Sequence, residues 1–167
     1  RACKPVAKWS PTRVARSDLE GELRCSIDDK GRVIIPKPFR DAFADGLHMV
    51  RGLSGVCLWL FPAADWPAKR DHLEARLSHG AGAVDAMRFL RTGAHEDPDR
   101  QGRVMLPPHL REHADLAPGA TVAVLGMGDW VELWNAERWQ ARALDVIARV
   151  EADLAAVDLG GLPGTRP

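Results

Sequence analysis

The sequence predicts an α+β fold that contains two copies of one β unit, with helices beside them. The segment DDKGRVIIP at residues 28–36 returns 71 residues later as DRQGRVMLP at residues 99–107. Short runs typical of β-strands surround both copies, and helical patterns follow each of them. A unit of under about 50 residues buries too little apolar surface to be stable alone. We therefore expect the copies to share one core, as a pseudo-twofold pair within the chain.

The repeat continues beyond this segment and divides the chain. At the same spacing, Phe39 and Arg40 match Leu110 and Arg111, and at a spacing of 73 a second block ending in tryptophan is repeated. The expected units are a flexible basic arm at residues 1–19, a first repeat at 20–66, connecting helices at 67–92, a second repeat at 93–139, a C-terminal helix at 140–158 and a disordered tail at 159–167.

The strands and turns of each repeat follow from short apolar runs and the residues between them. Strands are predicted near residues 23–27, 33–35, 48–50 and 56–61 in the first repeat, and near 121–125 and 131–134 in the second. Between the first two runs, Asp28 begins a hairpin turn in which Gly31 takes a positive φ, a conformation that side chains disfavour. Gly102 is expected to do the same.

Helical patterns follow the hairpins. Pro36 and Pro107 each mark the end of a strand, and apolar residues spaced by three and four predict a short helical turn after them. Longer helices are expected near residues 65–77 and 84–92, separated by a break at 78–82. Asn135 is expected to cap a last helix that runs to about residue 157, where a glycine-rich end follows.

Charge is distributed unevenly although the net charge is zero. Residues 1–40 contain ten Lys and Arg against five Asp and Glu, a net charge of +5, and the rest of the chain carries −5. Such asymmetry concentrates a positive field on one part of the surface, which attracts anionic partners. A solvated surface with a basic tail is the alternative interpretation of charge alone.

The cysteines, the apolar runs and the histidines limit the classes to which the protein can belong. Cys3, Cys25 and Cys57 offer neither a disulfide framework nor a zinc ribbon, so we expect a reducing, cytoplasmic setting. No run approaches 18 apolar residues and no signal peptide is visible, so we expect a soluble protein without a membrane partner. His109 and His113 lack a third ligand and the order of a zinc-protease motif, so no metal is expected. No G-x-S-x-G motif, P-loop or dinucleotide-binding motif appears, so no cofactor, small-molecule substrate or catalytic residue is expected.

The motif D-x-x-G-R occurs at residues 28–32 and again at 99–103, each time followed by alternating apolar residues and a proline. Further runs are LWLFP at 58–62, FLRTGA at 89–94 and GMGDWVELW at 126–134. Together these motifs resemble the MraZ family, bacterial regulators encoded at the start of the division and cell-wall gene cluster. The resemblance covers residues 20–145, and two copies of the motif in register are far more specific than one.

The resemblance implies a sequence-specific DNA-binding transcriptional regulator that catalyses no reaction. Its repeats are expected to be AbrB-like swapped-hairpin β units that form an intramolecular pseudo-dimeric barrel with flanking helices. Members of the family assemble into ring-like homo-oligomers and bind tandem short repeats in their own promoter region, usually to repress. The implied partners are therefore double-stranded promoter DNA and further copies of the chain, in the cytoplasm at the nucleoid.

The resemblance also assigns a candidate site. The implied DNA-binding residues are basic residues in and beside the two hairpins: Arg24, Lys30, Arg32, Arg100 and Arg103. The residues that support the motifs are Asp28, Gly31, Asp99 and Gly102. An arginine fork matches guanine O6 and N7 or a phosphate, and a hairpin presents it at an edge that enters a groove. Asp28 is expected to hold the fork of Arg32, and a purely structural ion pair within the turn is the alternative.

The second hairpin departs from the family pattern. Pro98 stands where the first repeat has Ile27, and a proline removes a donor from the strand ladder. The lysine of the first turn is replaced by Gln101 in the second. We therefore expect the second hairpin to be less regular, and Arg32 to contribute more to DNA affinity than Arg103.

Two other functions stay open. An oligomeric protein-interaction or assembly module without specific DNA binding would use the repeats to bind protein, and its basic face would be incidental. An antitoxin of the same fold would have one repeat and a disordered toxin-binding tail, which two repeats and a C-terminal helix disfavour. Binding to the native upstream DNA but not to a scrambled fragment distinguishes a regulator from an assembly module.

Overall fold

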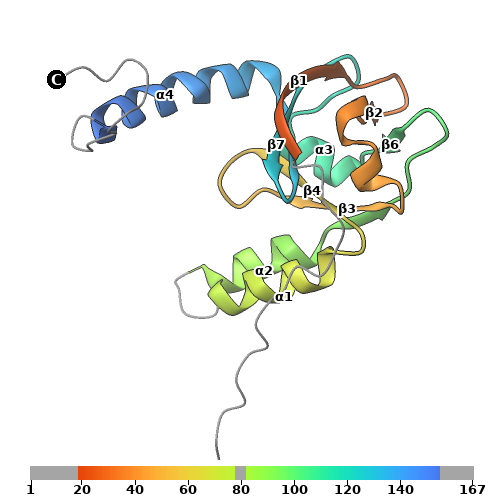
Figure 1. The fold of residues 1–167 in the computed structure, drawn as a ribbon, viewed down its shortest axis with the longest axis horizontal. Coiled ribbons are helices and arrows are strands. Elements are labelled where there is room, and N and C mark those ends of the chain that lie inside the picture. Colours follow the sequence, from red (N-terminus) through yellow and green to blue (C-terminus); the bar gives the residue numbers. More distant parts are fainter. Residues whose placement is uncertain (1–18, 78–81, 155–167) are drawn as a thin grey trace, which may run out of the picture.

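A six-stranded antiparallel sheet forms the body of the protein, and a helical hairpin and a long helix project from it (Figure 1). The structure is a computed structural model that describes residues 19–77 and 82–154. Its strands are β1 Leu19–Ser26, β2 Arg32–Ile34, β3 Leu47–Arg51, β4 Cys57–Pro62, β5 Ala94–Glu96, β6 Arg103–Met105, β7 Thr121–Gly128 and β8 Val131–Asn135. Its helices are α1 Trp66–Leu77, α2 Ala83–Arg91, α3 Pro108–Ala114 and α4 Ala136–Leu154, and short 3-10 turns span Lys37–Phe39 and Asp41–Phe43.

The strands pair across the two repeats. The large sheet has the order β1-β7-β8-β4-β3-β5, and a separate two-stranded ribbon pairs β2 with β6. β1 of the first repeat therefore lies on β7 of the second, while β5 of the second lies on β3 of the first. Each repeat thus supplies strands that satisfy backbone donors and acceptors of the other.

The register of the central pairs is that of a pseudo-twofold axis. Trp59 of β4 faces Glu132 of β8, its own equivalent at the repeat spacing of 73. Val33 of β2 faces Val104 of β6, its equivalent at the spacing of 71. A residue that faces its own equivalent lies on a twofold axis, so strand register relates the two copies as a pseudo-dimer within one chain.

One hydrophobic core is shared by both repeats. Its buried residues include Val33, Ile35, Phe39, Leu58 and Leu60 from the first repeat, and Val104, Leu106, Leu110, Val131 and Leu133 from the second. α3 contacts β3, β4 and β8 and covers this face of the sheet. Burial of apolar surface is the main favourable term in folding, at roughly 25 cal/mol per Å². The sequence expectation of a single shared core matches this arrangement.

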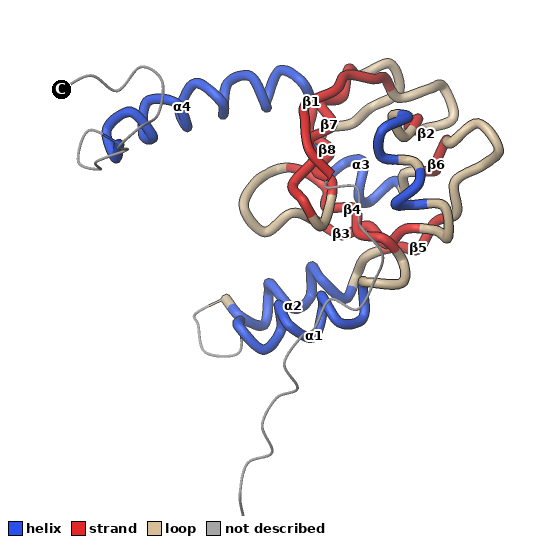
Figure 2. The backbone as a smooth tube through the Cα atoms, viewed as in Figure 1, coloured by secondary structure: helices blue, strands red, loops and turns tan. Residues whose placement is uncertain are grey.

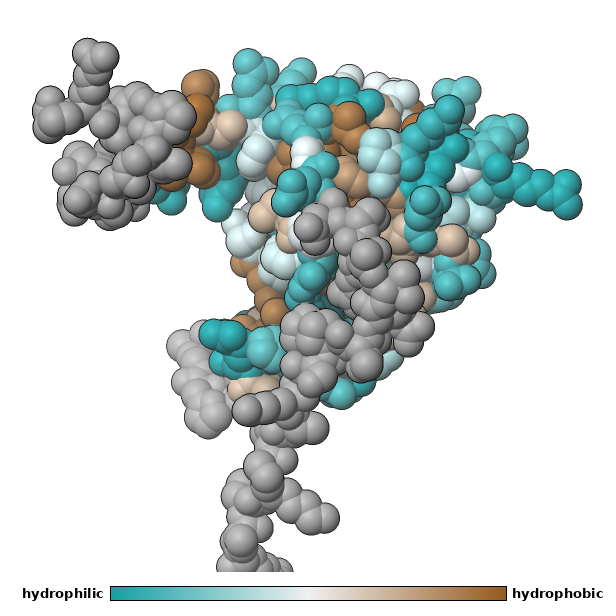
Figure 3. Space-filling view, in the orientation of Figure 1, coloured by the Kyte–Doolittle hydropathy of each residue, from teal (hydrophilic) through white to brown (hydrophobic). Residues whose placement is uncertain are grey.

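The opposite face of the sheet carries an aromatic layer. Side chains alternate along a strand, so Trp59 and Phe61 of β4 point away from the shared core. Phe61 lies 5.2 Å from Trp66 and 6.2 Å from Trp130, measured between ring centroids. Trp66 opens α1, which runs side by side with α2 below the sheet (Figure 2). Brown, apolar surface is visible where this helical hairpin meets the body, and again on α4 (Figure 3).

The structure confirms the α+β class and most predicted elements. α1, α2 and α4 begin within one residue of their predicted starts, at Trp66, Ala83 and Ala136. β5 was not predicted, because Ala94–Glu96 has no apolar alternation and becomes a strand only by pairing with β3. Among the described residues the sheet ends at β1 and β5, so its closure into a barrel stays a prediction.

Some predicted segments lie outside the part of the chain that the structure describes. These are the basic arm up to residue 18, most of the break at 78–82, the end of the last helix beyond residue 154 and the tail. Within residues 19–77 and 82–154, none of the helices has the length and apolarity that crossing a membrane requires.

Candidate nucleic-acid interface

The β2–β6 ribbon presents two arginines on one outward face. Val33 and Val104, at the middle of the two strands, are buried in the shared core. Because side chains alternate along a strand, the residues on either side of each valine face outward. These residues are Arg32 and Ile34 on β2, and Arg103 and Met105 on β6. The ribbon therefore offers a small surface with two guanidinium groups and two apolar side chains, the latter 39% and 41% exposed.

The first turn fixes the fork of Arg32. The Gly31 N–H donates to the Asp28 carbonyl oxygen over 2.9 Å, and Gly31 has the expected positive φ, 76°. One carboxylate oxygen of Asp28 accepts hydrogen bonds from the backbone N–H groups of Lys30 and Arg32, both at 2.9 Å. The other carboxylate oxygen of Asp28 accepts a hydrogen bond from Arg32 Nε at 2.7 Å and lies 2.6 Å from a terminal nitrogen of the same guanidinium.

The second turn repeats this geometry. Asp99 accepts the backbone N–H groups of Gln101 and Arg103 at 2.9 and 3.0 Å, and Arg103 Nε at 2.8 Å. Gly102 has a φ of 78°. The irregularity expected from Pro98 is limited to the preceding strand, since β5 ends at Glu96 and spans three residues, whereas β1 spans eight.

The ion pairs lower the pKa of both aspartates. Hydrogen bonds from the side chain and then the backbone of Arg32 hold the pKa of Asp28 below its ordinary 3.8. The same contacts from Arg103 lower the pKa of Asp99 from 3.8 to about 2. Both carboxylates are therefore ionised at neutral pH, and each compensates the charge of the arginine that it holds.

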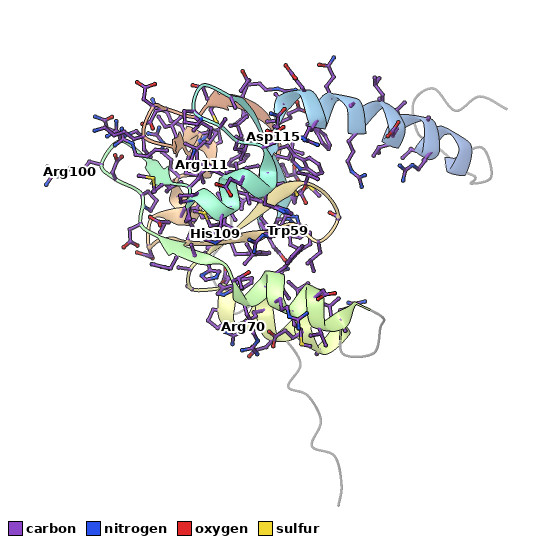
Figure 4. All side chains as sticks on the ribbon, turned by 180° about the vertical axis from the view of Figure 1, so that it is seen from behind. Trp59, Arg70, Arg100, His109, Arg111 and Asp115 are labelled. Atoms are coloured by element: carbon purple, nitrogen blue, oxygen red, sulfur yellow. The ribbon has the colours of Figure 1, made fainter. Side chains whose placement is uncertain are left out.

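Lys30 and Arg100 occupy the tips of the two turns. Both are exposed, and neither forms an ion pair with any residue within 19–77 or 82–154. Arg100 projects from the body on the side away from α4 (Figure 4). Lys30 and Arg100 at the turn tips thus lie on the same ribbon and turns as the motif arginines, Arg32 and Arg103.

Arg24 lies in the large sheet instead of the ribbon. Arg24 is on β1, opposite Ala123 of β7, and it forms an exposed ion pair with Glu22 at 2.5 Å. Its side chain lines an open cavity of about 470 Å³ formed with residues 119–121 and the start of α4. The structure therefore brings together four of the five basic residues predicted from the sequence and places Arg24 in different surroundings.

Comparison with known sequences identifies the family. The pattern of the family described as MraZ protein, antitoxin-like, matches residues 19–86 and 89–153, which accounts for most of the chain in two successive segments. The chain belongs to the MraZ family. The resemblance seen in the sequence motifs is therefore confirmed, together with the presence of two repeats.

Curated relatives in the MraZ family are named transcriptional regulators. The chain is 41% identical to the transcriptional regulator MraZ of Thermus thermophilus over 145 residues, which cover 86% of this chain and 98% of that protein. It is 39% identical to the Deinococcus radiodurans regulator over 140 residues, 83% and 94% of the two chains. It is 37% identical to the Salinispora arenicola regulator over 139 residues, 83% and 93% of the two chains. Regulation of transcription is not an enzymatic role.

Two arginines of this MraZ family member were not singled out as site residues from its sequence. Arg40 and Arg111 are equivalent at the spacing of 71, and each lies against the turn of the opposite repeat. A Cβ added to Gly31 would lie 2.9 Å from Arg111 Nε, and one added to Gly102 would lie 2.7 Å from Arg40 Nε. The only sequence signal for them was the repetition itself, which says nothing about contact across the repeats.

The two histidines considered as metal ligands contact protein groups. His109 Nε2 lies 3.2 Å from the Thr92 carbonyl oxygen, and His113 packs edge-on against Phe89 with 5.7 Å between ring centroids. Burial lowers the pKa of His113, which favours its neutral form. In the described part of the chain, no three His, Cys, Asp or Glu side chains are grouped so as to hold a metal ion.

Proposed function

We propose that the protein is a sequence-specific DNA-binding transcriptional regulator that represses its own division and cell-wall gene cluster through tandem short promoter repeats. The observation that carries this proposal is the outward face of the β2–β6 ribbon, where Arg32 and Arg103 lie at twofold-related positions and each is held by the aspartate of its own turn. The names of the curated relatives support a role in transcription. Promoter DNA as the partner implies action in the cytoplasm, at the nucleoid.

The ribbon suits a duplex groove. The major groove of B-DNA, about 12 Å wide, admits a two-stranded antiparallel ribbon. Asp28 holds Nε and one terminal nitrogen of Arg32, and the remaining terminal nitrogen has no partner among the described residues. A side chain already fixed in this way loses little rotamer entropy when it binds a guanine or a phosphate. Ile34 and Met105 on the same face offer apolar contact to thymine methyl groups.

Lys30 and Arg100 extend the proposed interface to phosphates at the two turn tips, because exposed cations beside a groove bind the backbone without reading sequence. Arg24 stays in the proposal as a more distant phosphate contact from β1. Asp28, Gly31, Asp99 and Gly102 support the turns and do not contact DNA themselves.

We include in the proposal the architecture that presents this face. The repeats at 20–66 and 93–139 form AbrB-like swapped-hairpin units of a pseudo-dimeric barrel, joined by the helices at 67–92 and flanked by the arm at 1–19, the helix at 140–158 and the tail at 159–167. Pairing of β1 with β7 and of β5 with β3, each across the repeats, supports the exchange of strands.

The proposed regulator acts as a ring-like homo-oligomer. One ribbon reads only a few base pairs, so selection of an operator in a genome needs linked contacts that raise one another's effective concentration. The exposed apolar residues of α4 support self-association: Leu144, Val146, Ile147 and Val150 are 36–65% exposed. The same helix face favours the second candidate, an oligomeric assembly module without specific DNA binding.

Titration of labelled duplexes with the full chain tests the proposal. Fluorescence anisotropy is measured on the native upstream region and on a scrambled fragment of equal length, from low to physiological salt. We expect tighter binding to the native fragment, with a log–log salt slope of roughly −0.9 per neutralised phosphate. Equal affinity for the two fragments, or no binding at low salt, would favour the assembly module.

A further inference from the structure

We propose that Arg40 and Arg111 are a second pair of DNA contacts, which bind backbone phosphates at the two ends of the β2–β6 ribbon. The inference rests on the proposed DNA-binding function and adds to it the residues that anchor the ribbon on the duplex. Neither residue belongs to the D-x-x-G-R motifs, and each follows the end of its ribbon strand by six residues in sequence.

Each of these arginines is anchored at a strand end through Nε alone. Arg40 Nε donates to the Ile35 carbonyl oxygen at 2.8 Å, and Arg111 Nε donates to the Leu106 carbonyl oxygen at 3.1 Å. Ile35 and Leu106 are the residues whose backbone N–H groups continue the ribbon beyond β2 and β6, onto the carbonyl oxygens of Gly102 and Gly31. The two guanidinium groups are therefore fixed at opposite ends of the ribbon, one at each turn.

The contact of each guanidinium with the opposite turn is close. The nearest atoms to a Cβ on Gly31 belong to the Arg111 side chain, and the nearest to a Cβ on Gly102 belong to Arg40. Both glycines are buried beneath these side chains. Any phosphate that meets Lys30 or Arg100 at a turn tip consequently lies near one of the two anchored arginines.

Charge distinguishes this pair from the motif arginines. Arg32 and Arg103 each lie within 2.7 Å of an aspartate oxygen, so each of those ion pairs has no net charge. For Arg40 and Arg111, no carboxylate lies within ion-pair distance among the described residues, and the terminal nitrogens of both have no hydrogen-bond partner there. They are uncompensated cations with free, parallel donors, the form of arginine that binds phosphate bidentately.

The experiment compares salt slopes of DNA affinity for Arg40→Gln, Arg111→Gln and the wild-type chain. Arg138→Gln is the matched control, because Arg138 is an exposed arginine paired with Asp115 near the start of α4, 3.0 Å away. A lost phosphate contact weakens binding to all sequences alike and reduces the slope by about 0.9 per engaged protomer. Between about 50 and about 200 mM salt, the affinity ratio of wild type to variant should then shrink about 3.5-fold.

The slope separates contact from a purely structural role. In each titration the protein concentration is that of the folded oligomer. A variant that only loosens the ribbon loses affinity without changing the number of phosphates neutralised, so its salt slope stays that of the wild-type chain. Arg40→Lys and Arg111→Lys keep the charge but lose the fork, so we expect them to retain the wild-type slope with weaker binding. A wild-type salt slope in both Gln variants would overturn the inference about Arg40 and Arg111 but leave the proposed function standing. Failure of the wild-type chain to bind DNA would overturn the proposed function.

Discussion

The aspartate of each D-x-x-G-R turn accepts three hydrogen bonds, and this makes the turns sensitive to acid. The folded-state pKa values of Asp28 and Asp99 lie below the ordinary 3.8, that of Asp99 at about 2. A depressed folded pKa contributes stability that is fully present above the unfolded value and is lost as pH falls through the folded one. Both turns therefore contribute at neutral pH and lose their contribution below about pH 4, down to about pH 2.

We predict that replacing both aspartates by asparagine flattens the acid dependence of stability. The free energy of unfolding, measured with urea at several pH values from 5 to 2, should fall less steeply in Asp28→Asn/Asp99→Asn than in the wild-type chain. Asp45→Asn, an exposed aspartate outside the turns, serves as control. The same steep fall in the double variant would show that other carboxylates dominate the acid response.

A second prediction concerns the unequal roles of the motif arginines in DNA binding. The two turns have the same hydrogen bonds, and the expected asymmetry rests on what precedes each arginine: Lys30 of the first turn is Gln101 in the second, and the strand before the first turn spans eight residues against three before the second. We expect Arg32→Ala to cost more DNA affinity than Arg103→Ala, with a loss of ~1–3 kcal/mol per base-reading contact. Anisotropy titration measures this at unchanged melting temperature and assembly. Loss of binding in Arg103→Ala alone would assign the principal reading hairpin to the second repeat.

Among the elements, each D-x-x-G-R turn places its glycine at a positive φ and against an arginine of the other repeat. Gly31 combines a φ of 76° with the Arg111 side chain 2.9 Å from where a Cβ would lie. Gly119 has a similar φ of 85° but no atom within 4 Å of that position. We predict that Gly119→Ala costs about 1–2 kcal/mol of unfolding free energy from the backbone alone, and that Gly31→Ala costs more because Arg111 must move. Equal losses in urea denaturation would show that Arg111 yields freely.

Elements with local chemistry could be predicted from the sequence, and those defined by a distant partner could not. Asp and Gly specify the turn at residues 28–31 by themselves, and Asn135 caps α4 through its side-chain oxygen, which accepts the Glu137 N–H at 3.0 Å. β5 has no such signal, because its three residues become a strand through β3. β1 begins at Leu19, four residues before its apolar run, because β7 continues beside it to Gly128.

The candidate site was predictable to the same extent. Repetition of D-x-x-G-R placed Lys30, Arg32, Arg100 and Arg103 correctly in and beside two turns, since the spacing within a turn is local. Their arrival on one ribbon depends on pairing between strands about 70 residues apart. Arg40 and Arg111 are set by a further step, the packing of a side chain on the other repeat.

At the scale of the whole molecule, strand pairing between the two repeats couples the site to the core. On each strand of the ribbon the central valine, Val33 or Val104, is buried in the core, and its two neighbours in sequence face outward. The same ribbon therefore closes the core and presents the outward face. The two turns cannot separate without exposing these valines. A single chain therefore has the rigidity that a dimer of single repeats would reach only by association.

α4 carries apolar side chains that stay exposed within the described chain. It projects from the body (Figure 1), and Leu144 and Ile147 are 65% and 53% exposed. Burying an aliphatic side chain of this size contributes about 1.5–3 kcal/mol, and each 1.4 kcal/mol changes an association constant about tenfold. Self-association through this helix would thus depend strongly on these two residues.

We predict that Leu144→Ser/Ile147→Ser shifts the oligomer toward a particle of 18.3 kDa, the mass of one chain. Light scattering at micromolar concentration measures the mass, and far-UV circular dichroism checks that helix content is kept. Asp145→Ser, on the same helix and also exposed, is the control and should leave the mass unchanged. Because linked ribbons raise one another's effective concentration, the double variant should also lose affinity for tandem sites but not for a single site. A wild-type mass of one chain would contradict the oligomer itself, and an unchanged mass in the double variant would place the contact elsewhere than on α4.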